Sequence, residues 1–542
     1  MGALTLKSFP FELRGWDIEK LESIDPTDGF GSDTRVYVSE NQIVQIEPDF
    51  NINSSGSWLT DKGRQFFDGL FGTWNPKKIK TLNQLELTNK DWSGIVNSIT
   101  KTLYMFEHCR TQQSKNNFFT IVFENLSVEL LSLLTLISQN QTFVKLRRIE
   151  NLKPNNDLES NFQLNLASNK IKLNSSTLCL LIANNPRYEG YHLNLNLRQR
   201  FLKGGFKCLI IGSLIDLTFP VSFLGSNLKV LKTIAEGNNI VCQEFKHSKN
   251  PMLIVNNELL KRNDGKTSLE ILKVLKYANV FSGSWNGLNM LNSSLSEVGT
   301  QSLNKFLPLN EKDLTNFSSL YFLNVTTNNI PTLKKIAKLK LLNPTTLNNN
   351  INPLFLDQNS KTNNNIEIYN NLNKIVNTKF QKYFYLPSSM FYENEETFIN
   401  TEGFVKRTNK LIFKKKTKNN WQILRRLFKY FKTNLTALDE KNHNLISFNS
   451  TKPAHFKNYI NFHYQATQTL TSVNFYLNTK NESFLLFGNI SNLRQKRAKF
   501  KMTKLKYWLD DFFNGGKDEY SQHSLVLSNC SQILRSKSTN FF

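Results

Sequence analysis

The stretch Thr177–Ser213 reads TLCLLIANNPRYEGYHLNLNLRQRFLKGGFKCLIIGS and holds two apolar runs separated by a polar, helix-compatible segment. The runs TLCLLIA and KCLIIGS are continuously apolar between their ends, as strands are when helices cover both faces of a parallel sheet. Between them, HLNLNLRQRFLKGG predicts a helix that ends at Gly204-Gly205, because glycine readily adopts the conformation that terminates helices. The stretch therefore predicts a strand–helix–strand unit of an α/β protein.

The same alternation extends outward in both directions. Further apolar runs occupy 118–124, 251–257 and 319–325, and an amphipathic segment follows each of them. Ser127 stands where it would cap the helix after the run at 118–124. We expect a doubly wound, mostly parallel α/β core over roughly residues 90–435. Regular alternation fades past residue 436, where the chain becomes basic and is expected to be irregular.

The first 75 residues follow a different pattern. Thr34–Asp49 contains two short β-like runs joined by Glu40-Asn41, which predicts a hairpin. The expected organisation is a small β-containing lead-in and docking domain at 1–75, an α/β domain at 76–435 and a basic C-terminal extension at 436–542. An Asn-rich segment at 345–378 is expected to be a surface insertion in the α/β domain.

Composition excludes several classes of protein. The chain has 542 residues, a formal charge of +25 and 39% hydrophobic residues, which suits a large folded protein with more than one core. The longest apolar stretch, Cys208–Gly225, is interrupted by Asp216 and Pro220 and does not resemble a membrane span. The amino terminus lacks the apolar segment of a secretory signal. Abundant Phe, Lys and Asn, residues of A+T-rich codons, predict an A+T-biased genome such as that of an organelle.

Metal-binding and catalytic patterns are not found in the sequence. The five cysteines are separated by at least 29 residues, and three of them lie in apolar runs, where cysteine is usually a small core residue. The seven histidines form no HxxxH or HExxH pair. DGKTS at 264–268 lacks the earlier glycine of a phosphate-binding loop, and the turns after the apolar runs are not GxGxxG. We therefore assign no catalytic, cofactor-binding or metal-binding residue from sequence, and expect no cofactor on this chain. The cysteines are Cys109, Cys179, Cys208, Cys242 and Cys530.

Several ordered stretches resemble the large iron–sulfur (75-kDa) subunit of respiratory complex I. RGWDIEKLESID at 14–25, DGFGSDTRVYV at 28–38 and WLTDKGRQFFDGL at 58–70 are similar to segments of that family. LLIANNPRYE at 180–189 and LPSSMFYENEETFINTEGFVKRT at 386–408 resemble later segments, and SQHSLVLSNC at 521–530 does so more weakly. The matches occur in the same order as in the family and cover most of the chain.

This resemblance implies a molybdopterin-oxidoreductase-like fold that serves as a structural lobe of the NADH-oxidising arm. Complete family members begin with a cysteine-rich half that binds iron–sulfur clusters, and this chain starts just after it. We therefore expect a split gene, with the clusters on a separate partner chain and no redox centre here. The expected enzyme is the proton-translocating NADH:ubiquinone reductase, to which this subunit adds no independent activity. It is expected on the matrix side of the mitochondrial inner membrane, among other peripheral-arm subunits, and encoded in the mitochondrial genome.

Two other functions stay open at this stage. An active molybdenum oxidoreductase of the same fold would need glycine- and serine-rich loops around its cofactor. A nucleic-acid-binding organellar protein would explain the basic tail and Lys414–Lys432, where Lys and Arg alternate with aromatic residues. The alternative for that segment is a solvated or subunit-facing basic surface, and we expect no nucleic-acid partner.

Four residues are singled out for structural roles. Trp16 and Trp58 are candidate anchors of a large apolar interface with the partner chain, because aromatic residues dominate such contacts. Their alternative role is ordinary packing in the core of the lead-in domain. Arg187 and Glu189 follow the strand at 177–183, where α/β folds bind ligands, and are expected to form a structural ion pair.

Overall fold

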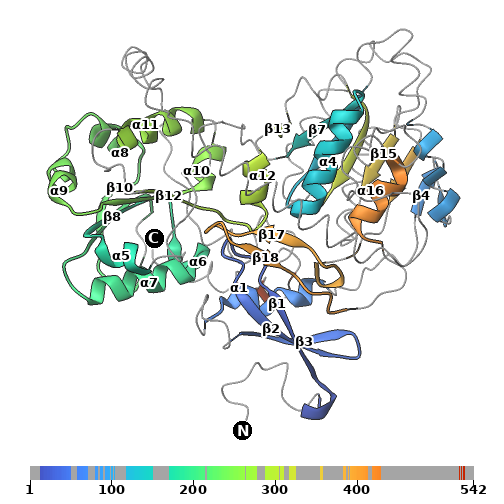
Figure 1. Ribbon diagram of the computed structural model, residues 1–542, viewed down its shortest axis with the longest axis horizontal. Coiled ribbons are helices and arrows are strands. Elements are labelled where there is room, and N and C mark those ends of the chain that lie inside the picture. Colours follow the sequence, from blue (N-terminus) through green and yellow to red (C-terminus); the bar gives the residue numbers. More distant parts are fainter. Residues whose placement is uncertain are drawn as a thin grey trace, which may run out of the picture.

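Two α/β lobes stand over a smaller β-rich lobe (Figure 1). The computed structural model describes residues 13–49, 58–70, 118–149, 170–213, 216–262, 264–277, 287–303, 306–309, 317–324, 391–412 and 418–428, together with short pieces at 80–103, 354–357, 382–385, 389 and 524–530. The Asn-rich segment apart from 354–357, and the basic extension apart from its last short piece, lie outside the described residues.

The five-stranded lobe is built on a wholly parallel sheet. Its strands run in the order β10-β9-β8-β11-β12. They are β8 (Leu178–Ile182), β9 (Lys207–Ile211), β10 (Ser222–Gly225), β11 (Met252–Asn256) and β12 (Leu288–Leu291). Because β8 and β11 are buried at every position, both faces of the sheet must be covered.

Helices cover the two faces of this sheet and form two separate apolar cores. One core joins alternate strand residues such as Leu180 and Val255 to the helices α8, α9 and α11, and the other joins Cys179 and Ile254 to α7. The helices of this lobe are α5 (Lys170–Ser175), α6 (Pro186–Glu189), α7 (Tyr191–Leu202), α8 (Lys229–Ala235), α9 (Val241–His247), α10 (Asn257–Lys261) and α11 (Gly265–Tyr277). The strand–helix–strand prediction for 177–213 is confirmed, with α7 followed by Gly204 and Gly205 at positive φ.

The eight-stranded lobe contains a mixed sheet of order β13-β7-β6-β14-β15-β16-β4-β5. The first six strands of this order pair in parallel with their neighbours. The last two, β4 and β5, pair antiparallel at one edge of the sheet. The strands are β4 (Lys80–Asn83), β5 (Glu86–Asn89), β6 (Phe118–Phe123), β7 (Val144–Arg148), β13 (Leu307–Pro308), β14 (Phe317–Leu323), β15 (Leu354–Asp357) and β16 (Lys382–Tyr385). Helices α4 (Val128–Asn140) and α16 (Asn420–Phe428) contribute to its apolar core, and α12 (Glu297–Leu303) packs against α4.

The prediction of an α/β fold is confirmed. However, the strands expected to form one core over residues 90–435 belong to two separate sheets. The apolar runs at 118–124 and 319–325 form β6 and β14 of one sheet, whereas those at 177–183, 207–213 and 251–257 belong to the other. Nothing in the local pattern of a buried strand states which other strand it will pair with. The helix after Ser127 begins as predicted, although the Ser127 side chain makes no capping hydrogen bond.

The lead-in lobe is centred on a three-stranded antiparallel sheet of order β1-β2-β3. Its elements are η1 (Gly15–Asp17), β1 (Glu19–Ile24), β2 (Asp33–Ser39), β3 (Gln42–Pro48), α1 (Asp61–Gln65) and α2 (Phe67–Leu70). The predicted hairpin is confirmed, and Glu40 and Asn41 both adopt positive φ, as a tight turn between twisted strands requires.

Distant parts of the chain complete the core of the lead-in lobe. The hairpin of β17 (Thr397–Ile399) and β18 (Val405–Arg407), preceded by η6 (Phe391–Glu393), supplies several of its buried apolar residues. Leu527, near the end of the chain, is buried in the same core. The boundaries at 75 and 435 stay predictions, and the structure adds that residues 1–75 do not hold this core alone.

The loop between β1 and β2 joins the lead-in lobe to the five-stranded lobe. Phe30 from this loop is 5% exposed, lies in the apolar core beside α7, and meets His192 edge-to-face at 5.7 Å between ring centroids. Gly29 lies so close to the sheet that a Cβ there would collide with the carbonyl oxygen of Asn292. Gly31 adopts φ +58°, where other residues are strained. The glycines of DGFGSD thus allow this loop to press Phe30 into the lobe.

Truncation of the Phe30 side chain tests whether it holds the lead-in lobe against the five-stranded lobe. Phe30→Ala removes a buried aromatic ring between two lobes and should lower the free energy of unfolding by about 3–5 kcal/mol, measured by urea denaturation. Phe404→Ala, at a phenylalanine that is 46% exposed, is the matched control and should change it by less than about 1 kcal/mol. Equal effects of the two substitutions would show that Phe30 does not hold the lobes together.

Candidate functional site

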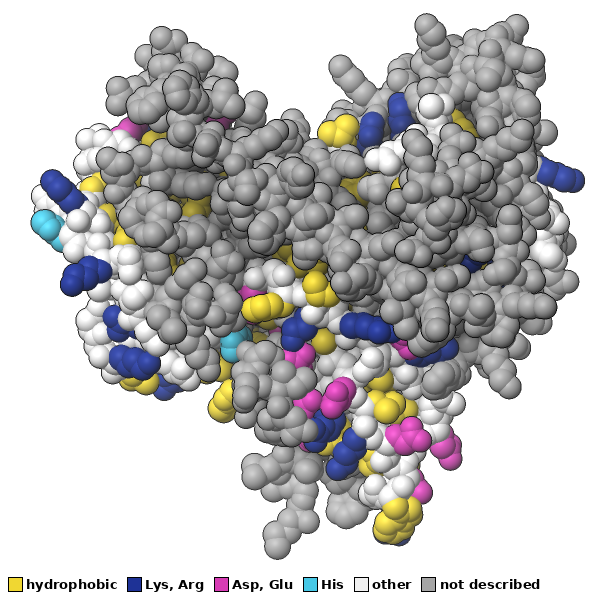
Figure 2. All heavy atoms as spheres, in the orientation of Figure 1, with side chains coloured by type: hydrophobic (Ala, Val, Ile, Leu, Met, Phe, Trp, Pro, Cys, Tyr) yellow, Lys and Arg dark blue, Asp and Glu magenta, His cyan; other side chains and the backbone are white. Residues whose placement is uncertain are grey.

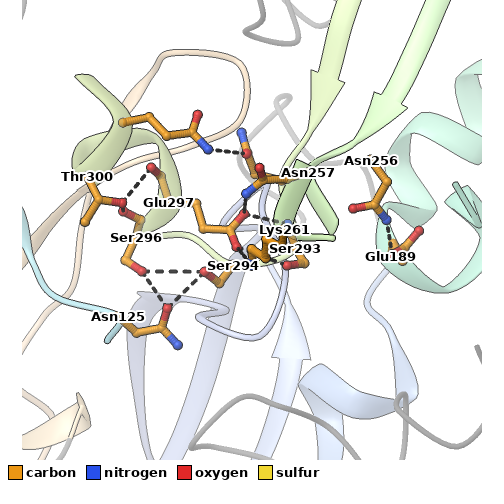
Figure 3. Close-up of polar contacts among 12 residues, drawn as sticks. Asn125, Glu189, Asn256, Asn257, Lys261, Ser293, Ser294, Ser296, Glu297 and Thr300 are labelled. Atoms are coloured by element: carbon orange, nitrogen blue, oxygen red, sulfur yellow. Dashed lines mark hydrogen bonds and ion pairs between the residues drawn. The ribbon is translucent and has the colours of Figure 1, made fainter. Parts of the chain in front are cut away.

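The carboxyl ends of strands from both α/β sheets meet above the lead-in lobe. In α/β folds this edge is where ligands bind, because the loops that follow the strands gather there. Asn125, just after β6, accepts hydrogen bonds at Oδ1 from the hydroxyls of Ser294 (3.1 Å) and Ser296 (2.9 Å), which follow β12 (Figure 3). Side chains at the ends of strands from two different sheets are therefore joined directly. We call this set of contacts the carboxyl-edge network.

Glu297 occupies the centre of the carboxyl-edge network. Its carboxylate accepts hydrogen bonds from Asn257 Nδ2 (2.8 Å), Lys261 Nζ (2.7 Å) and the Ser293 backbone N–H (3.1 Å), as Figure 3 shows. The Glu297 side chain is 3% exposed and that of Lys261 is 11% exposed. A charge buried this deeply is tolerated only with such partners, so Glu297 binds the end of β11 to the end of β12.

Glu189 extends the network to the end of β8. Its carboxylate accepts hydrogen bonds from the Asn185 backbone N–H (2.7 Å) and from Asn256 Nδ2 of β11. Arg187 points elsewhere and forms its salt bridge with Asp216 at 2.9 Å, on the surface. The expected ion pair between Arg187 and Glu189 was therefore wrong. Arg187 and Glu189 lie at i and i+2 of the short helix α6, and side chains with that spacing point to different sides of a helix.

Backbone contacts place the lead-in lobe against this edge. The Thr401 backbone N–H donates to the carbonyl of Gly29 at 2.7 Å, and Asn400 Nδ2 donates to the carbonyl of Phe30 at 3.1 Å. Glu129, at the start of α4, accepts from the Thr397 backbone N–H at 2.9 Å. The hairpin β17–β18 thus binds both the β1–β2 loop and the eight-stranded lobe, which holds the three lobes in one arrangement.

Two buried aspartates lie in the same loop. Asp25 accepts from the backbone N–H (2.8 Å) and hydroxyl (2.7 Å) of Thr27, while Asp28 accepts from Gly31 N–H and the Ser32 hydroxyl. Burial, together with the charge of Asp28, raises the pKa of Asp25 to about 7, although Thr27 and Lys62 act in the opposite direction. Burial also raises the pKa of Asp28. Two like charges in one dry loop are costly, so both carboxyls bind a proton more readily here than they would in water.

The cysteines are structural where they are described. Cys179 and Cys208 are paired neighbours on β8 and β9, are 0% and 1% exposed, and lie in the same apolar core. The neighbouring Cys208 thiol and burial raise the pKa of Cys179 well above its usual value. Cys242 is half-buried against the other core of the five-stranded lobe. Core packing, as expected for these three, is confirmed. Within the described ranges, no group of three or more His, Cys, Asp or Glu is placed to hold a metal ion.

Comparison with known proteins identifies the class. Residues 86–430 match the family model described as molybdopterin oxidoreductase, and this match covers more than half of the chain. The chain therefore belongs to the molybdopterin oxidoreductase family. Acetylene hydratase from Pelobacter acetylenicus shares the fold, with a TM-score of 0.50 at 9% identity over 78% of this chain and 71% of that one.

Within the molybdopterin oxidoreductase family, the curated relatives that this chain matches are subunits of NADH-ubiquinone oxidoreductase. The chain is 32% identical over 317 residues to the NADH-ubiquinone oxidoreductase 75 kDa subunit of Reclinomonas americana, which is 56% of this chain and 45% of the relative. It is 25% identical over 444 residues to the mitochondrial 78 kDa subunit of Candida albicans, covering 80% of this chain and 56% of the relative. The potato mitochondrial iron-sulfur protein 1 of NADH dehydrogenase is 26% identical over 328 residues, 60% of this chain and 43% of the relative. The chain thus spans about half the length of the curated relatives it matches.

One match corrects an expectation from sequence. Residues 18–68 match a model described as the NADH-ubiquinone oxidoreductase NDSU1/NuoG-like 4Fe-4S domain. The expectation that this chain carries no cofactor was therefore wrong, because this match points to an iron–sulfur cluster on it. The matched residues fit such a cluster poorly by themselves, since 18–68 contain no cysteine or histidine, the usual ligands. No electron-transfer step is assigned to them.

The molybdopterin cofactor of the family also fits the carboxyl edge poorly. Lys261 is bound to Glu297 and Arg187 to Asp216, although a phosphate-bearing cofactor needs cations or backbone N–H groups turned toward it. The β1–β2 loop lies directly against Asn292 at the end of β12. No step is therefore derived through that cofactor. The residues that build this edge were missed in the sequence because Asn125, Asn257 and Glu297 lie far apart along the chain and follow no motif.

Removal of the central carboxylate tests the carboxyl-edge network. Glu297→Ala leaves the buried Asn257, Lys261 and Ser293 groups without this acceptor and should lower the free energy of unfolding by about 3 kcal/mol, measured by urea denaturation. Glu236→Ala, which removes an exposed salt bridge to Lys232 on α8, should cost less than about 1 kcal/mol. A loss at Glu297 as small as the loss at Glu236 would contradict the proposed role.

The buried aspartate predicts a pH dependence. Folding raises the pKa of Asp25 from 3.8 to about 7, so the stability gained from binding its proton is complete below about pH 4 and is lost as the pH rises through 7. Asp25→Asn should therefore stabilise the protein at pH 8 relative to wild type by on the order of 1–3 kcal/mol, and the difference should shrink toward pH 4. Thermal and urea unfolding at several pH values measure this. Gln42→Ala, at an exposed residue without a titrating group, should leave the pH profile unchanged.

Proposed function

We propose that this chain is a structural subunit of the NADH-oxidising arm of a mitochondrial NADH:ubiquinone oxidoreductase. The observation that carries the proposal is the similarity to 75 and 78 kDa subunits of that enzyme, together with matches to both a molybdopterin-oxidoreductase model and a NuoG-like model. In this proposal the chain supports electron transfer from NADH to ubiquinone by holding neighbouring subunits in place, and adds no independent catalytic activity.

The architecture supports a role as a rigid support. Contacts between strand ends of both sheets, such as Asn125 with Ser296, and the insertion of Phe30 fix the lobes relative to one another. A support must keep its docking surfaces at constant separation, because electron-transfer partners have to be held in a fixed geometry. Interlocked buried polar groups favour a single arrangement over a range of arrangements.

The docking partner in this proposal is a separate iron–sulfur chain, bound by the lead-in lobe. Trp16 is 81% exposed and Trp58 is 65% exposed, which excludes the alternative that they pack in the lobe's core. Trp16 precedes β1, while the backbone oxygen of Trp58 accepts a hydrogen bond from Tyr191 of α7 at 2.6 Å. Exposed tryptophans are frequent anchors at protein interfaces. We expect the interface to be of the obligate kind, above about 2,000 Å².

Location follows from the same proposal. The relatives from Candida albicans and potato are named mitochondrial. We propose that this chain lies on the matrix side of the mitochondrial inner membrane and that the mitochondrial genome encodes it. The A+T-codon bias of the composition supports this origin. No helix in the described part of the chain is both long and apolar enough to cross a membrane. A chain that associates with the membrane through other subunits of the complex would need no membrane-spanning helix.

The described part of the basic segment offers nucleic acid little stacking surface. Lys418 lies over the ring of Trp92 at 4.7 Å, and Arg425 lies over that of Trp421 at 5.3 Å. These aromatic faces already carry cations from the same chain, and the apolar face of α16 is buried in the core. This arrangement favours a solvated or subunit-facing surface.

Loss of the two exposed tryptophans tests the docking proposal. Native purification of the tagged full-length chain should recover complex I subunits, identified by mass spectrometry. Trp16→Ala combined with Trp58→Ala should reduce that recovery at least about 10-fold, because each large aromatic anchor contributes on the order of 2 kcal/mol. Phe223→Ala, at another exposed aromatic residue on β10, is the control and should leave recovery unchanged. If the double variant assembled as well as wild type, these residues would not be anchors.

A further inference from the structure

The charge of the lead-in lobe is opposite to that of the whole chain. Residues 13–68 contain eleven Asp and Glu but only five Lys and Arg, although the chain as a whole is +25. Figure 2 shows Asp and Glu side chains gathered on the lower lobe, while Lys and Arg lie along the left flank of the five-stranded lobe. Such an asymmetry indicates that the surface of this lobe meets a different kind of partner from the rest of the molecule.

Two of the buried acids in the lobe are paired with cations, whereas the exposed acids at its free end are not paired with any residue that the structure describes. Asp33 is paired with Lys406 at 2.7 Å, and Asp49 with Arg35 at 2.9 Å. In contrast, the exposed carboxylates of the free end have no ion pair within the residues that the structure describes. They are Asp17, Glu19, Glu22 and Glu40. Among the described residues nearby, Arg14 stacks on Trp16 and Lys20 lies over Tyr37.

These groups gather around the more exposed tryptophan. Trp16 and Asp17 belong to η1, and Glu19 begins β1 directly afterwards. Glu19 is paired in register with Val38, so the hairpin turn at Glu40 lies beside the start of β1. We call Trp16, Asp17, Glu19 and Glu40 the acidic tip. The dark-blue turn η1, which holds Trp16 and Asp17, lies at the end of the lobe away from the α/β lobes (Figure 1).

We propose that the acidic tip is an interaction surface for a protein partner that presents lysines and arginines around an apolar pocket for Trp16. The proposal rests on the structural role proposed above and adds the chemistry of the partner. Nucleic acid and anionic membrane surfaces would be repelled by these exposed carboxylates, whereas a basic protein surface is attracted. An aromatic anchor surrounded by complementary charge is the usual arrangement of energetically important interface residues.

The two components of the tip act on different steps of binding. Exposed charges mainly raise the rate of association, and their effect is screened by salt over a Debye length of about 8 Å at physiological ionic strength. The aromatic anchor Trp16, which would be buried once the partner is bound, mainly slows dissociation. Charge variants of the tip should therefore change the association rate and its salt dependence, which the loss of a merely structural residue would not do.

The test compares two sets of charge reversals in the full-length chain. Asp17→Lys, Glu19→Lys and Glu40→Lys reverse the tip, while Asp216→Lys, Glu236→Lys and Glu244→Lys make an equal charge change on the five-stranded lobe. Binding to purified complex I subunits that co-purify with wild type is followed by surface plasmon resonance at 50 and 300 mM salt. The tip variant should associate at least about 10-fold more slowly at low salt, and high salt should abolish the difference. The control should associate within about two-fold of wild type.

The outcomes separate this inference from the proposed function. If wild type recovers no complex I subunit, the proposed function fails. If wild type recovers them and the tip variant binds with the same rate and salt dependence, the acidic tip is not the interaction surface. A homodimer of wild type that the tip variant abolishes would assign the surface to a second copy of this chain and overturn the inference. Thermal melting checks the fold, and Asp17→Asn with Glu19→Gln, a milder variant, should give an intermediate rate.

Discussion

The insertion of the β1–β2 loop against the end of the five-stranded sheet is the contact on which the rest of the structure depends. Phe30 enters an apolar core that belongs to another lobe, and Gly29 brings the backbone within contact of Asn292. The hairpin β17–β18 then binds that loop through Thr401 and Asn400. A side chain larger than hydrogen at position 29 would separate the lobes, so a single loop sets the position of the lead-in lobe and of everything it presents to a partner.

Burying polar groups at the junction is costly unless each finds a partner, and this explains the form of the carboxyl edge. Glu297 and Glu189 each collect hydrogen bonds from asparagines at the end of β11, and Asn125 collects two serine hydroxyls from the other sheet. In a fold whose relatives include enzymes, these contacts turn an edge suited to ligand binding into an internal joint. The carboxylates of Glu297 and Glu189 thus bind groups of this chain, and the edge joins strands of the fold to one another.

The surface features divide between the lobes in a way that suits a support. The α/β lobes carry most of the positive charge of the chain and contain one parallel and one mostly parallel sheet, whereas the lead-in lobe carries exposed carboxylates and two exposed tryptophans. The lead-in lobe and the rest of the chain therefore carry net charges of opposite sign.

The sequence by itself determined the α/β class, the strand–helix–strand unit at 177–213, the hairpin at Glu40-Asn41 and the family, because buried strands, tight turns and colinear motifs are local patterns. It could not determine that β6 and β14 belong to a different sheet from β8, since strand pairing depends on contacts between distant segments. It also paired Arg187 with Glu189, although the fold turns Arg187 to Asp216 and Glu189 to Asn256. Only the tertiary structure decided that Trp16 and Trp58 are exposed, because burial depends on which segments pack together. It also decided that Asn125, Asn257 and Glu297 lie in one network, because strands far apart in sequence end at the same edge.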